Sequence, residues 1–313
     1  MKLDTNILLH AMPAFLLLAI AEGIFFVKEH HKLNTAREFL ASCGLGIGYV
    51  ILSPFTKGVN LFTYSFIYEH RICDLSGNIV LAWLVCFLGD DLTYYCSHRL
   101  SHEVRFLWAS HSVHHSAETF SLAAAFRQSW TNNLMGTFLL WAWLPLLGIN
   151  PAMLLFTKSL NVIYQFWLHT EAIKKLPRFI EFIFNTPSHH RVHHGSDIEY
   201  LDKNHAGILI IWDRIFGTYQ DETHRPQYGL TKNIHSANPF AITFYEWKNL
   251  VQDLKRSAGL KDALSYIFKA PGWSKDGSNK TTHDLQKPQP GYTKQSPCCS
   301  GNCSQCSLKL LHQ

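Results

Sequence analysis

Charged residues are scarce in this sequence. Only 16% of its 313 residues are charged, whereas 47% are apolar and 13% are aromatic. The apolar residues are gathered in blocks, so the composition excludes an ordinary soluble protein and favours a membrane protein. The net charge of +5 is small. We interpret it through its position relative to the apolar blocks, and we expect no nucleic-acid partner.

The cysteines do not form the framework of a small secreted domain, so nothing requires an oxidising compartment. Four of them are scattered through apolar sequence, as small buried hydrophobic residues are: Cys43, Cys73, Cys86 and Cys96. The other four crowd the C-terminal end: Cys298, Cys299, Cys303 and Cys306. This terminal cluster suits an accessory four-sulfur zinc site, with lipid attachment or simple disorder as the alternatives.

Several cofactor-binding motifs are also absent. The sequence shows no dinucleotide-binding glycine pattern and no haem-binding motif, so the reductant of any redox reaction must come from a partner or a diffusible donor. The zinc-protease pattern His-Glu-x-x-His is missing too. Glu103 follows His102, but the residue four positions after His102 is Phe106.

Long apolar blocks predict membrane helices. Blocks of about 20 residues suit a membrane span, and the sequence holds five candidates: 7–27, 40–55 with a continuation past Pro54 as an alternative, 79–96, 130–147 and 152–168. The last two flank a turn at 148–151 and predict a hairpin of helices, each about 27 Å long.

Three boxes of histidines stand out between these blocks. "HRLSH" contains a pair at i and i+4, and "HSVHH" and "HRVHH" each contain three histidines at i, i+3 and i+4. On a helix these offsets place the rings on one face, so each box can direct several imidazoles at a common centre. The eight boxed residues are His98, His102, His111, His114, His115, His190, His193 and His194.

A metal centre accounts for these boxes better than a structural role or a pH sensor does. Protonating so many neighbouring rings would cause strong repulsion, whereas a metal requires neutral imidazole and supplies the positive charge itself. No box contains a cysteine, which argues against structural zinc. Eight nitrogen ligands exceed the needs of one tetrahedral zinc, so we expect two metal ions with open positions. Imidazole suits iron, and an all-nitrogen di-iron centre suits oxygen chemistry.

Further residues are expected at or beside this centre. His169, in "FWLHTEAI", is a candidate ninth ligand, and His205 is a weaker one. Asp91 lies seven residues before His98 on nearly the same helical face, and we expect it to orient a ring through its second nitrogen. We also expect His189, Asn185 and Asp202 to lie beside the ligands.

The boxes also bear on orientation in the membrane. A hairpin goes out and back, so the segments 98–115 and 189–194 return to the same face, and the loop 28–38 falls there too. Most lysines and arginines near the spans fall on this face, whereas Lys57 and Arg71 fall opposite. By the positive-inside rule, the histidine face is cytoplasmic, at the inner membrane of a bacterium or at the endoplasmic reticulum of a eukaryote.

The predicted fold is therefore all-α, with polytopic membrane helices and a cytoplasmic, histidine-rich helical catalytic cap. We expect four parts: transmembrane helices in 1–97, a histidine-box catalytic domain in 98–225 that includes the hairpin at about 130–168, cytoplasmic or interfacial helices in 226–273, and a flexible tail in 274–313 that carries the cysteine cluster.

At these residues the sequence resembles the fatty acid hydroxylase superfamily of membrane di-iron enzymes, which includes the sterol desaturases and methyl-sterol oxidases. The similarity runs from about Asp91 to Trp273. It includes "DLTYYCSHRLSHEVRFLWASHSVHHSAETF", "NTPSHHRVHHG" and "DKNHAGILIIWDRIFGTY". Within the superfamily, "HSVHHSAETFSLAAAFRQS" and "YQFWLHTEAI" look most like the branch that cleaves alkylglycerol ethers.

The resemblance implies two iron ions, O2 and a membrane lipid as substrate. In that branch, hydroxylation at the ether carbon gives a hemiacetal that breaks into an aldehyde and a glycerol. It also implies tetrahydrobiopterin as electron donor, with Glu103 as the pterin-associated carboxylate. An ion pair of Glu103 with Arg99, one turn back, is the alternative, and a cytochrome or other redox protein is the alternative donor.

Other functions stay open from the sequence. Sterol desaturation, methyl-sterol oxidation or fatty acid hydroxylation would use the same boxes on another lipid. A histidine-lined metal transporter would place its ligands within the spans, whereas these boxes lie at the span ends. A zinc-dependent membrane hydrolase is the third alternative.

Overall fold

The computed structural model describes residues 3–30 and 33–287, and in these ranges it is all-helical without a β-strand. The cysteines proposed to bind zinc lie outside the described residues. Twelve α-helices and three short 3-10 helices follow one another in these ranges: α1 (Ile7–His30), α2 (Leu33–Glu69), α3 (Ile79–Glu103), α4 (Arg105–His115), η1 (Leu122–Phe126), η2 (Asn132–Leu134), η3 (Thr137–Trp141), α5 (Trp143–Leu146), α6 (Pro151–Phe166), α7 (Arg178–Ile183), α8 (Pro187–His193), α9 (Ile211–Phe216), α10 (Pro239–Arg256), α11 (Leu260–Phe268) and α12 (Thr282–Gln286).

Three of the described helices are long and apolar enough to cross a membrane. The apolar segments are Ile7–Phe25 in α1, Ala36–Glu69 in α2 and Ile79–Glu103 in α3. Large apolar side chains on α2 are mostly exposed, for example Ile51 at 71% and Phe62 at 76%, as expected of a surface that faces lipid. The chain is therefore built as a membrane protein, and α2 continues through Pro54 as one helix of 37 residues.

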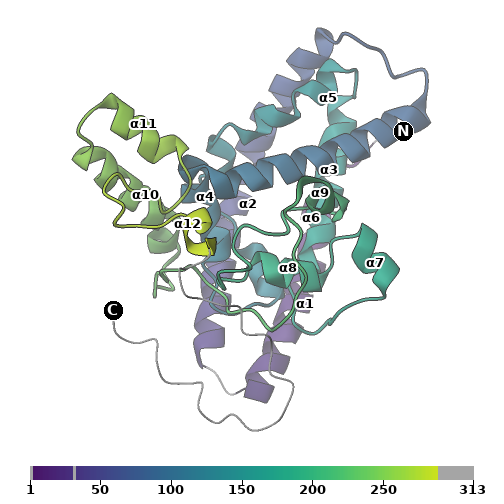
Figure 1. Ribbon diagram of the computed structural model, residues 1–313. Coiled ribbons are helices and arrows are strands. Elements are labelled where there is room, and N and C mark those ends of the chain that lie inside the picture. Colours follow the sequence, from purple (N-terminus) through teal and green to yellow (C-terminus); the bar gives the residue numbers. More distant parts are fainter. Residues whose placement is uncertain (1–2, 31–32, 288–313) are drawn as a thin grey trace.

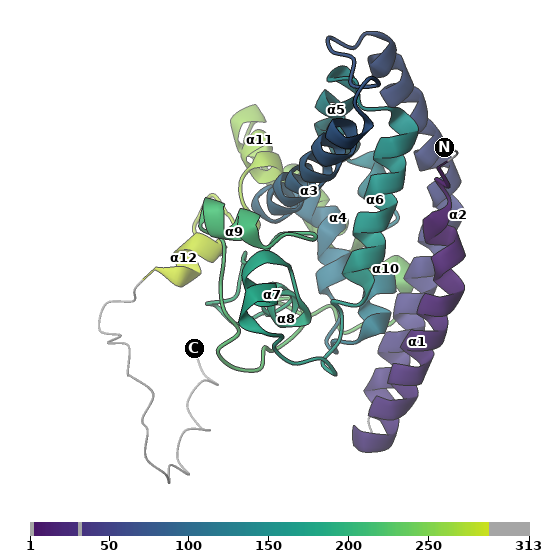
Figure 2. The ribbon, with the colours of Figure 1, turned by 90° about the vertical axis from the view of Figure 1, so that its right-hand side faces the viewer.

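The long helices form one layer beside the histidine-bearing part. Figure 2 shows α1 and α2 side by side, with α3 and α6 between them and the helices α7, α8 and α9. The Lys57 ammonium in the middle of α2 donates to Asn6 Oδ1, just before α1, at 2.7 Å. On the inner face of α3, Cys86 packs in a buried cluster with Leu144, Leu154 and Tyr64. This cluster fixes α3 against α5 and α6.

The predicted hairpin of two equal helices is wrong in its first half. Residues 130–147 are broken into η2, η3 and the four-residue α5. Gly136, between η2 and η3, has φ = 73°, which is left-handed and ends a helix. The Ser129 hydroxyl accepts a hydrogen bond from the Thr131 amide and so competes with helical pairing. The cytoplasmic assignment of the histidine face relied on this hairpin and stays a prediction.

The second half of the hairpin is helical, as α6. Asn150 caps it by accepting from the Ala152 amide at 2.9 Å, and Pro151 occupies its first turn, where the missing amide costs nothing. Its 16 residues give a helix about 24 Å long, shorter than a membrane span of about 20 residues. The helix ends at Phe166 and delivers His169 to the histidine boxes.

The C-terminal helices cover α4. Helix α10 packs on α4, and α11 returns along α10; Figure 1 shows these helices and α12 on the side of the molecule opposite α7. Within the predicted tail, the short helix α12 forms with a capping box between Thr281 and Asp284. Gln286 then donates to the Ile198 and Leu201 carbonyls.

Candidate metal centre

A break between α3 and α4 brings the first two histidine boxes face to face. Val104 has an extended backbone, with φ = −114° and ψ = 116°, so α3 ends at Glu103 and α4 begins at Arg105 in a new direction. The last turns of α3 carry the first box, and the last turns of α4 carry the second. Helix α8 starts with Pro187 in its first turn and carries the third box.

Five histidines converge to form what we call the five-histidine group: His98, His102, His111, His115 and His193. One ring nitrogen of each lies within 4.8 Å of those of the others. His98 Nε2 is 2.9 Å from His111 Nε2, which is 3.2 Å from His115 Nε2. The Nε2 atoms of His102 and His193 are buried without a hydrogen-bond partner among the described residues. Such convergent, unpaired nitrogens fit a metal ion.

Four more histidines form the four-histidine group: His114, His169, His190 and His194. His190 Nε2 lies 3.0 Å from His169 Nε2 and 3.2 Å from His194 Nε2, and His169 Nε2 lies 3.3 Å from His114 Nε2. The rings of His115 and His194 stack at a centroid distance of 4.4 Å and join the two groups. The structure thus gathers all nine predicted ligands in two adjacent groups, each able to hold one metal ion.

The second ring nitrogen of several ligands is engaged by the protein. His98 Nδ1 contacts the His205 carbonyl at 2.7 Å, and His193 Nδ1 contacts the Lys203 carbonyl at 2.9 Å. Because a carbonyl only accepts, each Nδ1 must carry the proton. Nε2 is then unprotonated, and its lone pair can bind a metal. The same arrangement holds for His169 Nδ1 with the Gln165 carbonyl at 2.9 Å and for His114 Nδ1 with the Arg127 carbonyl at 3.3 Å.

Burial keeps these rings neutral. Desolvation lowers the pKa of His169 to about 4 and that of His114 to about 3, although backbone hydrogen bonds oppose the shift in both. Burial, followed by repulsion from neighbouring histidines, places the pKa values of His111 and His194 well below the ordinary value of 6.5. Neutral imidazole is the form that binds a metal, so the site is prepared for one at neutral pH.

The loop 202–209 closes the five-histidine group, and two buried aspartates hold it. Asp213 accepts from the amides of His205 at 2.7 Å and Ala206 at 2.8 Å. Asp91 accepts from the Ile208 and Leu209 amides and from Trp212 Nε1, at 2.8 to 3.0 Å. The expectation that Asp91 orients a histidine ring is therefore wrong. It positions the loop whose carbonyls orient the rings.

No individual signal in the sequence marks Asp213 or the loop carbonyls, and any residue type supplies a carbonyl. The segment "DKNHAGILIIWD" carries them all, and its glycine is explained by close packing. A Cβ on Gly207 would lie 2.6 Å from Asn161 Oδ1 and 3.1 Å from Asp91 Oδ1. His205 is near the group, with its ring 4.9 Å from that of His102, but its Nε2 contacts the Asp202 carbonyl at 3.1 Å.

The three residues predicted beside the ligands have different positions. Asp202 contacts His102 Nδ1 at 3.2 Å. Burial by itself would raise the pKa of Asp202, but the hydrogen bond and the charge of His102, together with a hydrogen bond from Thr282, lower it. Asn185 touches no ligand ring; its side chain donates to the Ala206 carbonyl at 2.6 Å and ties α8 to the closing loop. His189 lies outside both groups, with Nε2 3.0 Å from Glu181 Oε2.

The remaining charges around the boxes are balanced. Arg191, between the histidines of the third box, forms a two-pronged pair with Glu222 at 2.6 and 2.7 Å, so it adds no net positive charge there. Glu103 pairs with Arg99 at 2.7 Å and is 46% exposed. Its position matches the ion-pair alternative, because its hydrogen bond and its ion pair are both with Arg99.

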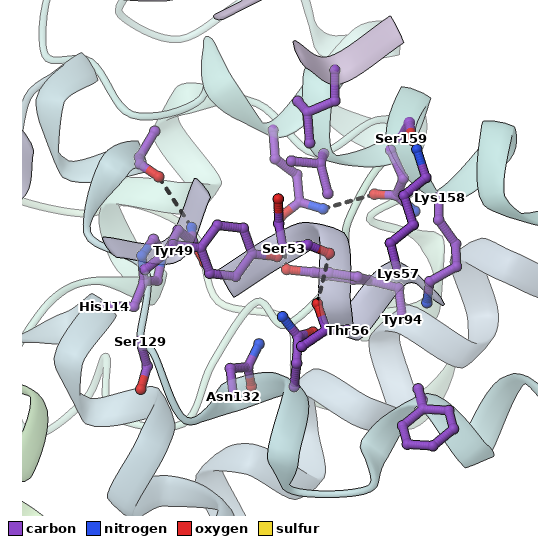
Figure 3. A pocket seen from close by; sticks show the side chains of 18 of the residues that line it. Tyr49, Ser53, Thr56, Lys57, Tyr94, His114, Ser129, Asn132, Lys158 and Ser159 are labelled. Atoms are coloured by element: carbon purple, nitrogen blue, oxygen red, sulfur yellow. Dashed lines mark hydrogen bonds between the residues drawn. The ribbon is translucent and has the colours of Figure 1, made fainter. Parts of the chain in front are cut away.

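A cavity of about 380 Å³ leads away from the histidines between α1, α2, α3 and α6. His98, His111, His114 and His169 line one part of it. Helix α1 contributes mainly apolar residues, α3 mainly polar ones, and α2 and α6 both kinds. In the close view of Figure 3, His114 and Ser129 lie on one side of the cavity, with Lys57 and Lys158 on the other. A long molecule embedded among the membrane helices can therefore reach the histidines.

The fold and the site define a class: a helical membrane protein with two adjacent histidine groups, each able to hold a metal ion, at the end of a cavity between its long helices. Comparison with known proteins agrees. Residues 83–218 match the family model described as Fatty acid hydroxylase, so the histidine-bearing part of the chain is similar to that family. This range contains most of α3, all of α4 to α9 and all nine histidines of the two groups.

Several curated relatives share this region. Alkylglycerol monooxygenase from Homo sapiens is 36% identical over 299 residues, which cover 94% of this chain and 65% of the relative. The protein of the same name from Danio rerio is 39% identical over 246 residues, or 78% of this chain and 54% of the relative. A cholesterol 25-hydroxylase-like protein from Danio rerio is 27% identical over 231 residues, or 67% of this chain and 86% of the relative.

The chain spans between about half and two thirds of the length of the alkylglycerol monooxygenases it matches. No solved structure matches it.

Proposed function

We propose that this protein is a membrane-bound non-haem di-iron oxygenase that hydroxylates a C–H bond of a lipid with O2. One observation carries the proposal: nine histidines, seven of them buried and two partly buried, direct their nitrogens at two adjacent centres at the end of a cavity among the membrane helices. Two bound iron ions would supply the reduction of O2 to an oxidant able to attack an unactivated C–H bond.

The chain's own residues perform three tasks in this proposal. The Nδ1 contacts of His98, His193 and His169 fix the rings with Nε2 toward the metals. The loop 202–209 covers the five-histidine group and excludes water from it. The cavity walls hold the lipid so that one carbon faces the histidines, which selects the C–H bond that reacts.

The names of the relatives favour alkylglycerols as the substrate class. Insertion of one oxygen atom of O2 at the ether carbon gives a hemiacetal, and this breaks into a fatty aldehyde and a glycerol. The second oxygen atom leaves as water, which requires two electrons and two protons from an external donor. A reduced pterin is the donor we propose, with a redox protein as the alternative.

The proposal includes the organisation expected from the sequence. The histidine-bearing cap faces the cytoplasm, where a soluble donor is available, and residues 98–225 form the catalytic domain. Residues 1–97 anchor it, 226–273 cover it and the terminal cysteines add an accessory zinc site. A metal transporter is less well supported, because the histidines gather at the end of the cavity instead of following a path through the spans.

The test begins with metal analysis of the purified protein. We expect about two irons per chain, and loading with zinc alone without iron-dependent turnover would refute the proposal. Membranes are then incubated with an alkylglycerol, a sterol or a free fatty acid, with reduced pterin or NADH as donor. Oxygen-dependent aldehyde release from the alkylglycerol alone supports ether cleavage. An oxidised product from the sterol alone or from the fatty acid alone would instead identify the protein as a hydroxylase of that lipid.

A further inference from the structure

A polar stripe runs along the cavity away from the histidines. On α6 it consists of Lys158, Asn161 and Gln165, and on α3 it includes Asp90 and Tyr94, all of which line the cavity. These spacings of three and four residues place each set on one face of its helix. Helix α1 contributes the apolar side chains Leu8, Leu9, Met12 and Phe15, and α6 adds Leu155, Val162 and Phe166. The polar stripe therefore runs through a cavity that α1 and α6 also line with apolar side chains.

Most of the stripe is internally hydrogen-bonded. Tyr94 donates to Gln165 Oε1 at 2.6 Å, and Gln165 donates to Asn161 Oδ1 at 2.7 Å. Asn161 donates to Asp90 Oδ2 at 3.2 Å, and the indole of Trp141 donates to Asp90 Oδ1 at 2.7 Å. The chain of bonds ends at Asp90.

Lys158 is the exception. Its ammonium lies 2.9 Å from the centre of the Trp141 ring, and Asp90 attracts it electrostatically. None of its three N–H groups is hydrogen-bonded within the described part of the chain. An ammonium without an acceptor in a membrane-embedded cavity is costly, unless the molecule that enters the cavity supplies one.

The charge of this end of the cavity selects the kind of ligand. Asp90 offsets the charge of Lys158, so a phosphate or carboxylate would meet repulsion from Asp90 as well as attraction to the lysine. An uncharged hydroxyl, ether or carbonyl oxygen accepts from Lys158 without that repulsion.

Helix geometry gives the length of the ligand's polar part. Eight residues separate Asp90 from His98 in α3, and eight separate Lys158 from the end of α6 at Phe166. At 1.5 Å per residue, both helices give about 12 Å between the Lys158 end of the stripe and the histidines. A single glycerol unit is too short to span this distance.

We propose that Lys158 binds the uncharged, hydroxyl-bearing head of an ether lipid whose glycerol carries a further polar group, such as a sugar, lying along the stripe. This inference rests on the proposed function, because it places the lipid in the same cavity, and it names the substrate class. The head fills the stripe between Lys158 and Tyr94, and the ether carbon at its near end faces the histidines. Lys158 is a binding residue and takes no part in the chemistry.

The test measures binding without turnover, using purified protein in lipid nanodiscs. The probes share one alkyl chain: a glycosylated alkylglycerol, a plain alkylglycerol, an alkyl phosphate and a dialkyl ether without hydroxyl groups. The variant Lys158→Met is compared with Lys269→Met. Lys269 also lies over a tryptophan, 4.2 Å from the Trp273 ring centre, but is not among the residues lining the cavity.

We expect the unmodified protein to bind the glycosylated lipid more tightly than the other three. Lys158→Met should weaken that binding by about tenfold, the effect of one lost hydrogen bond to a charged group. It should leave the dialkyl ether unaffected, and Lys269→Met should change neither. If Lys158→Met binds no lipid at all, Lys158→Gln, which keeps a donor, must bind the dialkyl ether normally and the glycosylated lipid weakly.

Unchanged binding of the glycosylated lipid to Lys158→Met overturns the inference. If the alkyl phosphate binds more tightly than the glycosylated lipid, the proposal of an uncharged head is wrong. If plain alkylglycerol binds more tightly than the glycosylated lipid, the proposed length of the head is wrong. The proposed function is tested separately, because a lipid that binds through Lys158 but is not oxidised refutes the oxygenase and leaves the inference in place.

Discussion

The two histidine groups are held in different ways. In the five-histidine group, the Nδ1 atoms of His98, His102 and His193 are contacted by His205, Asp202 and Lys203, all in one loop. In the four-histidine group, the corresponding contacts are the carbonyls of Gln165 on α6 and Arg127 after η1. The geometry of the five-histidine group therefore depends on the loop 202–209, which follows the first two histidine boxes by about a hundred residues. The geometry of the four-histidine group depends on α6 and on the segment after η1, which also line the cavity.

This difference assigns separate tasks to distant parts of the chain. The loop 202–209 keeps its shape through Asp91 and Asp213, so the five-histidine group is sensitive to residues that touch no ligand. The four-histidine group is coupled to the cavity, because α6 carries both the Gln165 carbonyl and the stripe that begins at Lys158. A substrate that moves α6 should therefore change the geometry of the four-histidine group before that of the five-histidine group.

The largest effect is expected from removing one ligand of each group. His190→Ala and His193→Ala change neighbouring positions of α8, but His190 belongs to the four-histidine group and His193 to the five-histidine group. Each should lower metal content from about two ions to about one per chain. Activity should fall by more than about 100-fold, since even residues that only orient ligands contribute 10–100-fold.

Metal analysis and turnover of the two purified variants, beside the unmodified protein, check this. Loss of both metals from either variant would show that the groups load as one cooperative centre. Retained activity would refute the assignment of that histidine as a ligand.

Asp213→Ala should affect the metal content of one histidine group and not of the other, although it replaces none of the nine histidines. Asp213 is fully buried, and its loss leaves the amides of His205 and Ala206 without an acceptor, at about 1–3 kcal/mol each. The five-histidine group should lose its metal, while the four-histidine group keeps its own. Metal content and thermal unfolding are measured beside Asp276→Ala, an exposed control. Equal metal loss from both groups would contradict a local role for the loop.

A smaller effect is expected from Asp202→Asn. This change replaces the carboxylate that accepts from His102 Nδ1 with an amide of similar size. Loss of such a partner weakens metal binding by about 10–100-fold, and here only one of the two ions should be affected. Titration with a competing chelator resolves the two affinities. Two equally weakened ions, or two unchanged ions, would each break the distinction between the groups.

The spacing of the eight boxed histidines is a local property, because offsets of three and four residues put side chains on one helix face whatever the tertiary structure. The structure brings these eight and His169 together, and their binding of metal stays a prediction. Their division between two groups was not predictable. His114 and His115 are adjacent on α4 yet belong to different groups, because consecutive residues of a helix point in directions about 100° apart.

The two failures in prediction have different causes. Asp91 was assigned to a ring on its own helix, but Ile208, Leu209 and Trp212, more than a hundred residues away, make all of its strong hydrogen bonds, so a non-local contact decides. The segment 130–147 is apolar enough for a helix, yet local features, Gly136 and the hydrogen bond between Thr131 and Ser129, break it into short turns. Apolar length alone does not distinguish a membrane helix from a cavity wall.

Acidification should weaken the metal-free fold. The folded pKa of His169 is about 4 and that of His114 about 3, both below the ordinary 6.5. At a pH between the folded pKa values and 6.5, the unfolded chain binds more protons than the folded chain does. The stability contributed by the neutral, buried rings is therefore complete above pH 6.5 and is lost as pH falls. The melting temperature of chelated protein should drop between pH 7.5 and pH 5.5. His114→Gln should reduce the slope, and a flat profile would contradict the burial of these rings.

The smallest effect is expected from Glu103→Gln, outside both groups. Glu103 is 46% exposed and pairs with Arg99, which is 34% exposed, and exposed pairs of this kind contribute little to stability. Metal content should stay at that of the unmodified protein, and turnover should stay within about twofold. Measuring kcat and KM with a reduced pterin and with a second reductant separates two roles, since an ion pair on the surface affects both donors alike. A large rise in KM for the pterin alone would restore Glu103 as the pterin-associated carboxylate and would add the end of α3 to the functional surface of the five-histidine group.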